Sequence, residues 1–197
     1  IVETGRGLTD KELQYWHKTK LRDKAILILF VTYGLRLKEL QQLNVSSFHF
    51  GRGEFTIYRK REKEIKMPLN RSVEKAITDY IQLERPADDT IPPKDRDALF
   101  LSLQKKRMTE KSIRQLVKKY SALALGTSPE NGYSPHKLRA TAATSLIQYG
   151  FSIYDVQNLL DHENVTTTQL YAAHKKNVKR EIVNQFEWLE EYNQTKK

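Results

Sequence analysis

The sequence AILILFVTYGLRLKEL, residues 25–40, joins the longest apolar run of the chain to a charged segment. The run at 25–31 lies between charged segments and is too short to cross a bilayer, so it predicts a buried helix over about 21–33. Gly34 can adopt the left-handed backbone conformation that commonly ends a helix. Leucines at helical spacing then predict a second, short helix over about 35–40.

Arg36 stands at this predicted helix junction, beside a strongly apolar helix. A guanidinium there must find an anion or reach solvent, because burying an unpaired charge is costly. Glu39, three residues further on, can be its ion-pair partner and can orient it. The residues alone leave two interpretations open, a simple salt bridge or an arginine held in place to bind an anionic ligand.

The rest of the chain predicts a small sheet among helices. Apolar residues mostly alternate between 45 and 70, and turns at 51–53 and 59–64 divide this segment into about three antiparallel strands. Residues 86–97 predict a loop, and 99–101 a short buried strand or turn. The other predicted elements are helices, at about 8–18, 21–33, 35–40, 73–84, 110–123, 135–149, 152–160, 166–173 and 177–192. Without strand–helix–strand alternation, this order predicts an α+β fold, mostly helical with a three-stranded antiparallel sheet.

Composition narrows the classes of partner. The chain of 197 residues carries 34 Lys and Arg against 24 Asp and Glu, a formal net charge of +10. This excess favours polyanions through counterion release, although an enzyme with a basic surface has the same balance. A hydrophobic content of 39% is too high for disorder. The absence of cysteine excludes disulfides and thiolate metal sites, and it suits a reducing cytosol.

Two residues of the helix predicted at 135–149 suit phosphate chemistry. Pro135 opens this helix, so His136 and Arg139 lie on one face of its N-terminal end. Unpaired N–H groups and the helix dipole favour an anion there. Arg139 can bind two phosphate oxygens at once, and His136 can transfer a proton near neutral pH. An ordinary capped helix with polar residues in its first turn fits the same pattern.

Two later residues are ambiguous when they are considered singly. His162 follows the helix predicted at 152–160, where it can donate a hydrogen bond to a phosphate or simply interact with the helix dipole. Tyr171 is one of ten tyrosines, and most tyrosines in such a segment are half-buried packing residues.

Together, these segments resemble the catalytic domain of the tyrosine recombinases, or phage-type integrases, from about residue 8 to 186. TYGLRLKEL at 32–40 is similar to the first-arginine motif of the family, and HKLR at 136–139 to its His-x-x-Arg motif. LLDH at 159–162 resembles its Leu-Gly-His segment, with Asp161 where glycine is usual. TTQLYAAH at 167–174 resembles the nucleophile segment. Each motif is weak alone, but four motifs in the order of the family are a specific signal.

The resemblance implies a reaction at a DNA phosphodiester. Arg36 and Arg139 would bind the two non-bridging oxygens and stabilise the charge that develops in the transition state. His162 would donate a hydrogen bond to the same phosphate, and Glu39 would orient Arg36 or its neighbours. Tyr171 would attack phosphorus, leaving a 3′-phosphotyrosyl link. No metal and no nucleotide cofactor would be required.

The resemblance also implies two proton carriers. His136 would accept or position the tyrosine proton, and a hairpin lysine would protonate the leaving 5′ oxygen. In the family this lysine opens the turn ahead of a strand that ends in an apolar-Pro-apolar segment, here 67–69, which indicates Lys60. The usual glycine flanks are replaced, giving Arg59-Lys60-Arg61, so Lys63 stays an alternative. A solvated basic turn that touches the DNA backbone is a further interpretation.

The resemblance also has implications for the partner, the oligomeric state and the domain organisation. It implies double-stranded DNA as the partner and a homo-tetramer that exchanges its C-terminal helix, although that helix can also dock on its own domain. We expect one catalytic domain over 1–197, with a core at about 8–176 and a C-terminal helix and tail at 177–197. Because the chain lacks an initiator Met, we expect a fragment without the N-terminal core-binding domain of the family.

The expected protein is a bacterial, cytoplasmic, nucleoid-associated enzyme without a membrane partner. Integration or excision of a mobile element is the preferred role, and resolution of chromosome dimers is another. A type IB topoisomerase-like enzyme and an inactive basic DNA-binding regulator are the alternatives.

Overall fold

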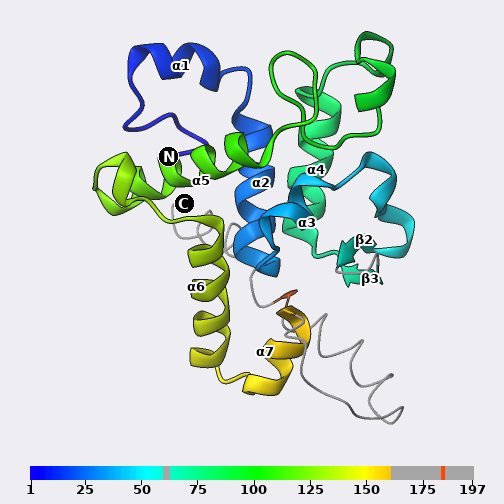
Figure 1. Ribbon diagram of the computed structural model, residues 1–197, viewed down its shortest axis with the longest axis vertical. Helices are drawn as coiled ribbons and strands as arrows, with labels where there is room; N and C mark the ends of the chain where they lie inside the picture. Colours follow the sequence, from blue (N-terminus) through cyan, green and yellow to red (C-terminus); the bar gives the residue numbers. More distant parts are fainter. Residues whose placement is uncertain (60–62, 161–182, 185–197) are drawn as a thin grey trace, which may run out of the picture.

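The computed structural model describes residues 1–59, 63–160 and 183–184, and Figure 1 shows their arrangement. This part of the chain forms helices α1 to α7 and strands β1 to β3. The helices are α1 (Asp10–Trp16), α2 (Lys20–Tyr33), α3 (Leu37–Gln41), α4 (Arg71–Leu83), α5 (Glu110–Leu125), α6 (Pro135–Gln148) and α7 (Ile153–Leu160). The strands are β1 (Phe48–His49), β2 (Glu54–Arg59) and β3 (Lys63–Pro68). The predicted mostly helical α+β fold is confirmed.

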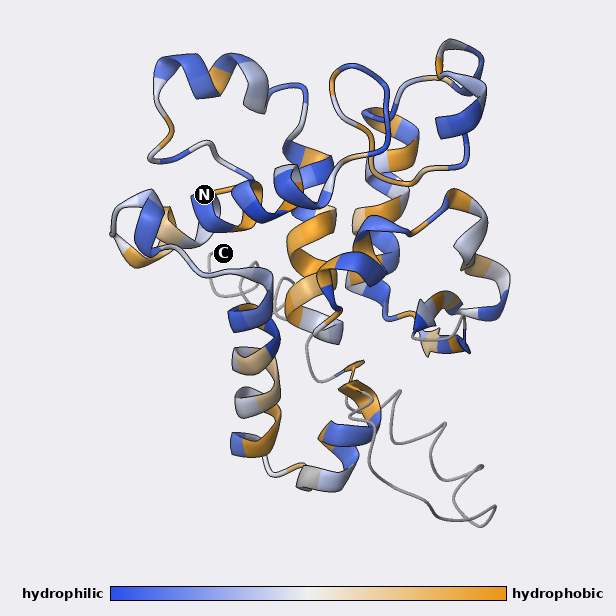
Figure 2. Ribbon diagram, in the orientation of Figure 1, coloured by the Kyte–Doolittle hydropathy of each residue, from blue (hydrophilic) through white to orange (hydrophobic). Residues whose placement is uncertain are grey.

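Helix α2 is the centre of the core, as its apolar sequence predicts. It packs against α4 and α6, and Figure 2 shows hydrophobic residues along most of its length. Ile26, Leu29 and Phe30 are completely buried, together with Tyr33 at its end. A helix that is apolar on all sides is stable only when other elements surround it, so α2 fixes the positions of its neighbours.

The N-terminus of α2 is capped from another helix. Thr19 precedes α2 without a side-chain capping bond. Instead the carboxylate of Glu84, at the end of α4, accepts hydrogen bonds from the backbone N–H groups of Leu21 at 3.0 Å and Arg22 at 2.7 Å. Burial raises the pKa of Glu84, since desolvation outweighs these two donors. The contact therefore joins α4 to the first turn of α2.

Replacing Glu84 by alanine is expected to lower the free energy of unfolding by about 1–2 kcal/mol, because two N–H groups of α2 lose their acceptor. Urea unfolding measures the change. The control is Asp79→Ala, which removes the α4 surface pair between Lys75 and Asp79 and should cost no more than about 0.5 kcal/mol. Equal losses in the two variants would contradict a capping role for Glu84.

The sheet has the order β1-β2-β3 with antiparallel neighbours, as predicted. Its inner face carries Phe55 and Ile57 of β2, with Met67 of β3 opposite Phe55. The predicted turn at 59–64 is too long, because the strands continue until Arg59 pairs with Lys63. The charge of Arg59 favours the turn, yet its side chain is buried, because it pairs with the buried carboxylate of Glu39.

The other predicted elements are confirmed within a few residues. The structure also shows a Thr9–Glu12 capping box at α1 and a Ser152 cap at α7. The loop at 86–97 contains two short 3₁₀ turns, and Leu101 forms an isolated bridge with Arg107. The helices predicted at 166–173 and, apart from 183–184, at 177–192 lie outside the described residues. Within the described ranges, no helix has the length and apolar character needed to cross a membrane.

Val183, in the short described segment 183–184, belongs to the same core as the rest of the described chain. Val183 is completely buried in the main hydrophobic cluster. The Asn70 side chain, which caps α4 by accepting the Val73 N–H at 2.8 Å, also donates to the Val183 carbonyl at 3.0 Å. This part of the C-terminal segment therefore docks on its own domain.

Candidate active site

The junction between α2 and α3 depends on Gly34. Its backbone is left-handed, with φ of 57°, and its N–H donates to the carbonyl of Phe30 at 2.9 Å, which ends α2. A Cβ at this position would lie 2.6 Å from Cδ2 of Leu160, the last residue of α7. Glycine is therefore required by the backbone conformation and by the close approach of α7.

Glu39 organises the residues that follow this junction. Its Oε2 accepts the backbone N–H of Arg36 at 2.8 Å, and its Oε1 accepts Nη1 of Arg36 at 3.0 Å. The Glu39 side chain is 4% exposed, whereas the Arg36 side chain is 38% exposed. The predicted Arg36–Glu39 pair thus exists, and it holds the arginine at the edge of the core rather than within it.

A second arginine meets the same carboxylate. Nε of Arg59 lies 3.1 Å from Oε1 of Glu39, and its side chain is only 2% exposed. Nη2 of Arg59 donates to the carbonyl of Leu159, near the end of α7, at 3.3 Å. Arg59 is not among the site residues that the sequence predicts. Its place in the alternation of β2, where Phe55 and Ile57 also face inward, is the signal that could have found it.

Arg139 connects the ends of α2 and α7. It lies in the second turn of α6, a helix capped by Ser134, whose hydroxyl accepts the Lys137 N–H. The Arg139 guanidinium is buried and donates through Nη1 to the carbonyl of Gly34 and through Nη2 to the carbonyl of Leu160. The positive charge of Arg139 therefore lies at Gly34, which precedes Arg36 by two residues.

The structure thus brings three of the predicted residues to one place, at the meeting point of α2, α3, α6 and α7. These are Arg36, Glu39 and Arg139. His136 is exposed in the first turn of α6, three residues before Arg139. Lys63 is exposed at the start of β3. The remaining predicted site residues, Lys60, His162 and Tyr171, lie outside the described residues.

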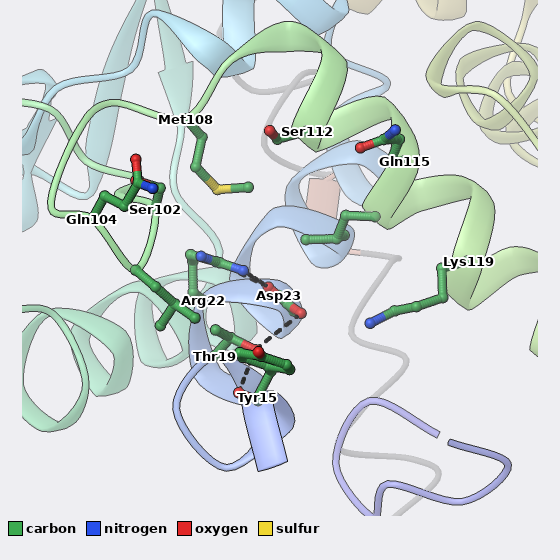
Figure 3. A pocket seen from close by; sticks show the side chains of 12 residues that line it. Tyr15, Thr19, Arg22, Asp23, Ser102, Gln104, Met108, Ser112, Gln115 and Lys119 are labelled. Carbon is green, nitrogen blue, oxygen red and sulfur yellow. Dashed lines mark hydrogen bonds and ion pairs between the residues drawn. The ribbon is translucent and has the colours of Figure 1, made fainter. Parts of the chain in front are cut away.

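A separate cavity of about 450 Å³ lies at the other end of α2 (Figure 3). Its walls include Tyr15 at the end of α1, Arg22 at the start of α2 and Lys119 of α5. Asp23, also in the wall, accepts a hydrogen bond from the Tyr120 hydroxyl at 3.1 Å, and burial raises the pKa of Tyr120. None of the described lining residues belongs to the predicted site, and the length of α2, roughly 20 Å, separates the two regions.

Comparison with known proteins supports the family resemblance that the sequence motifs indicate. A profile of the phage integrase family matches residues 9–178. The tyrosine recombinase XerC of Caldanaerobacter subterraneus subsp. tengcongensis is 40% identical over 166 residues, 84% of this chain and 45% of that protein. The tyrosine recombinase XerD of Staphylococcus epidermidis is 32% identical over 165 residues, 84% of this chain and 54% of that protein. The chain spans about half the length of the curated relatives it matches.

Solved structures show the same fold at low identity. The crystal structure of the XerA recombinase superposes with a TM-score of 0.62 and 24% identity, covering 91% of this chain and 65% of that one. The XerH site-specific recombinase bound to its difH substrate superposes with a TM-score of 0.62 and 23% identity, covering 89% of this chain and 46% of that one.

Proposed function

Because this chain belongs to the phage integrase family, we propose that it is the catalytic domain of a tyrosine recombinase, which cuts and rejoins DNA at specific sites. The observation that carries the proposal is the contact of Arg139 with the Gly34 carbonyl. It brings the two arginine motifs, about a hundred residues apart in sequence, to one junction. Two guanidiniums held close together suit the two non-bridging oxygens of one phosphate.

In the proposed reaction, Arg36 and Arg139 stabilise the charge that grows on the phosphate as the Tyr171 hydroxyl attacks phosphorus. A bond forms between the tyrosine oxygen and phosphorus while the bond to the 5′ oxygen breaks, which gives a 3′-phosphotyrosyl link. His162 donates a hydrogen bond to the phosphate. The link conserves the bond energy, so the 5′ hydroxyl can reverse the reaction without a nucleotide cofactor.

Two proton transfers complete the proposed reaction. His136 receives or positions the proton of Tyr171, and its exposed place on the first turn of α6 leaves it accessible to DNA. Lys60 protonates the leaving 5′ oxygen, with Lys63 as the alternative. Lys63 is the first residue of β3 and pairs with Arg59 of β2, and Arg59 contacts Glu39. A lysine at this end of the hairpin therefore lies close to Glu39.

The partner and assembly are proposed on the same basis. Double-stranded DNA is the substrate, in agreement with the net charge of +10 and with the DNA-bound XerH neighbour. We propose one catalytic domain that works as a homo-tetramer on DNA, exchanges the end of its C-terminal helix and acts in the bacterial cytoplasm at the nucleoid. A core-binding domain outside these residues would complete the clamp around DNA, and the relatives, of which the matched residues make up 45% and 54%, support that arrangement.

The biological role has two candidates. The sequence favoured integration or excision of a mobile element, and phage and transposon integrases are among the structural neighbours at 20–22% identity. The relatives with 32–40% identity are named XerC and XerD, which favours resolution of chromosome dimers, the other role considered.

Covalent capture on DNA tests the proposed chemistry. A nicked suicide substrate carrying the recombination site is expected to give a protein–DNA adduct on a denaturing gel with the wild-type protein and none with Tyr171→Phe. The control is Tyr149→Phe, which removes the hydroxyl of an exposed tyrosine at the end of α6 and should leave the adduct unchanged. A wild-type protein without adduct, as expected of an inactive regulator, or an adduct with Tyr171→Phe, would refute the mechanism. Strand exchange between two duplexes distinguishes a recombinase from a topoisomerase-like enzyme.

A further inference from the structure

We propose that Ser121 is a positioning residue for His136. Together with a close contact at Gly132, it joins the loop before α6 to the side of α5, and this fixes the first turn of α6, from which His136 receives or positions the proton of Tyr171. The inference rests on the proposed function, since it names what holds one of the proposed proton carriers in place. Ser121 lies fifteen positions before His136, and none of the sequence motifs includes it.

The first observation is the hydrogen bond between α5 and the loop that leads into α6. This loop turns back along α5 (Figure 1), and the Ser121 hydroxyl oxygen accepts the backbone N–H of Tyr133 at 2.7 Å. The hydroxyl of Ser121 donates to the carbonyl of Val117, one turn back on α5, at 2.7 Å. Because that bond uses the hydroxyl hydrogen, the lone pairs of the oxygen are left for Tyr133. The segment directly before α6 is thus bonded to another helix.

Gly132 brings the same loop into direct contact with the α5 backbone. Its φ of −62° and ψ of 152° are accessible to any residue, so the backbone conformation does not require glycine. A Cβ at this position would overlap the carbonyl oxygen of Lys118 and would lie 2.9 Å from the carbonyl carbon. Backbone atoms cannot move aside as the end of a side chain can, so the close approach explains the glycine. The loop and α5 are therefore closely packed at this point.

These contacts act on His136 because little chain separates them from it. Ser134, next to Tyr133, caps α6 by accepting the Lys137 N–H at 3.2 Å, and Pro135 restricts the backbone at the first helical position. His136 follows directly. The Tyr133 ring adds a contact of its own, because Nζ of Lys137 lies 4.4 Å from its centroid. The first turn of α6 is therefore bound to the loop that α5 holds.

Arg139 attaches the next turn of α6 to a different part of the molecule. Its guanidinium donates to the carbonyls of Gly34 and Leu160, which joins α6 to the ends of α2 and α7. A helix held at one point can tilt about it, whereas attachments on both sides of His136 remove this freedom. A proton acceptor must lie within hydrogen-bond reach of its donor, so a shift of about an ångström at His136 is enough to slow the transfer.

The test measures adduct formation by Ser121→Ala and Gly132→Ala over a range of DNA concentrations. Each variant is expected to slow the maximal rate by about threefold to tenfold, while the DNA concentration at half-maximal rate changes by less than about twofold, because a proton acceptor is displaced rather than a DNA contact. Ser121→Thr keeps the hydroxyl and should retain most of the rate. The matched control for Gly132 is Gly51→Ala, since Gly51 also lacks a positive φ and a Cβ there would meet nothing within 4 Å.

A double-mutant cycle distinguishes positioning from structural support. If Ser121 acts through His136, Ser121→Ala should slow the His136→Ala variant further by less than about twofold, because the group that it positions is already absent. The stability control is Glu84→Ala, which removes the cap at the far end of α2 and should leave the rate within about twofold of wild type well below the melting temperature. Multiplied losses in the double variant, a wild-type rate in Ser121→Ala, or a Ser121→Thr variant as slow as Ser121→Ala would overturn the inference.

Amide hydrogen exchange gives a second readout that needs no catalysis. The N–H groups of Lys137 and Leu138, which bond to Ser134, should exchange at least about threefold faster in Ser121→Ala than in wild type. The Val73 N–H, in the capped first turn of α4, should be unchanged. Unaltered exchange at Lys137 and Leu138 would refute the inference. If wild type forms no adduct but this exchange pattern holds, the proposed function fails, while the attachment of the first turn of α6 through Ser121 stands.

Discussion

Replacing Arg139 by methionine is expected to slow DNA cleavage by at least about 100-fold and to lower the free energy of unfolding by about 2–4 kcal/mol. The rate falls because one of the two proposed phosphate ligands is lost. Stability falls because the carbonyls of Gly34 and Leu160 lose a buried donor. Adduct formation on the suicide substrate and urea unfolding measure the two effects separately.

Two further variants separate charge from geometry at this position. Arg139→Lys keeps the positive charge, but a single ammonium cannot reproduce the planar fork that spans both carbonyls, so an intermediate loss of rate and stability is expected. Arg114→Met removes one positive charge from an exposed position on α5 and should change neither quantity appreciably. If Arg139→Met keeps the wild-type midpoint in urea and cleaves within threefold of wild type, Arg139 does not have this dual role.

Replacing Gly34 by alanine is expected to cost about 2–4 kcal/mol of stability and to slow cleavage by at least about tenfold. The left-handed conformation alone costs about 1 kcal/mol for a residue with a Cβ. The added atom would also lie 2.6 Å from Cδ2 of Leu160, so the Leu160 side chain at the end of α7 must shift, whereas its distance of 3.5 Å from Cγ of Arg139 is an ordinary contact. Displacement of about an ångström at a catalytic group is enough to reduce the rate.

Gly126 provides the matched control for this substitution. It ends α5 with φ of 62°, close to the 57° of Gly34, but a Cβ there would meet nothing within 4 Å. Gly126→Ala should therefore show the backbone cost of about 1 kcal/mol without the clash and without loss of cleavage. Urea midpoints of the two variants measure the difference, and equal losses would mean that contact with Leu160 does not constrain the junction.

Features of this fold that depend on residues close together in the sequence could be predicted from the sequence. The Gly34 helix end, for example, involves only residues within one helical turn. The Arg36–Glu39 pair was predicted for the same reason, because donor and acceptor are three positions apart in the sequence.

The buried arginines were harder to predict because their partners are remote. Arg59 meets Glu39 from twenty positions away and Leu159 from a hundred, and an arginine in a polar stretch is ordinarily exposed. Arg139 was predicted as a phosphate ligand, but its bonds to two backbone carbonyls depend on how α6 and α7 fold back on α2. The roles of Lys60, His162 and Tyr171 stay predictions from the motifs.

The attachment of Val183 limits how a C-terminal exchange between protomers can occur. Withdrawing this side chain from the core would cost about 1.5–3 kcal/mol, and the bond from Asn70 to its carbonyl would also be lost. A swap of the whole tail would therefore have to break these contacts first, whereas a swap that begins after Val183 leaves them in place. The hinge of any exchange is expected after residue 184, which leaves the apolar Phe186, Trp188 and Leu189 as the segment that a neighbouring subunit could receive. In such an exchange, the buried Val183 would keep the start of the donated segment bound to the domain that supplies it.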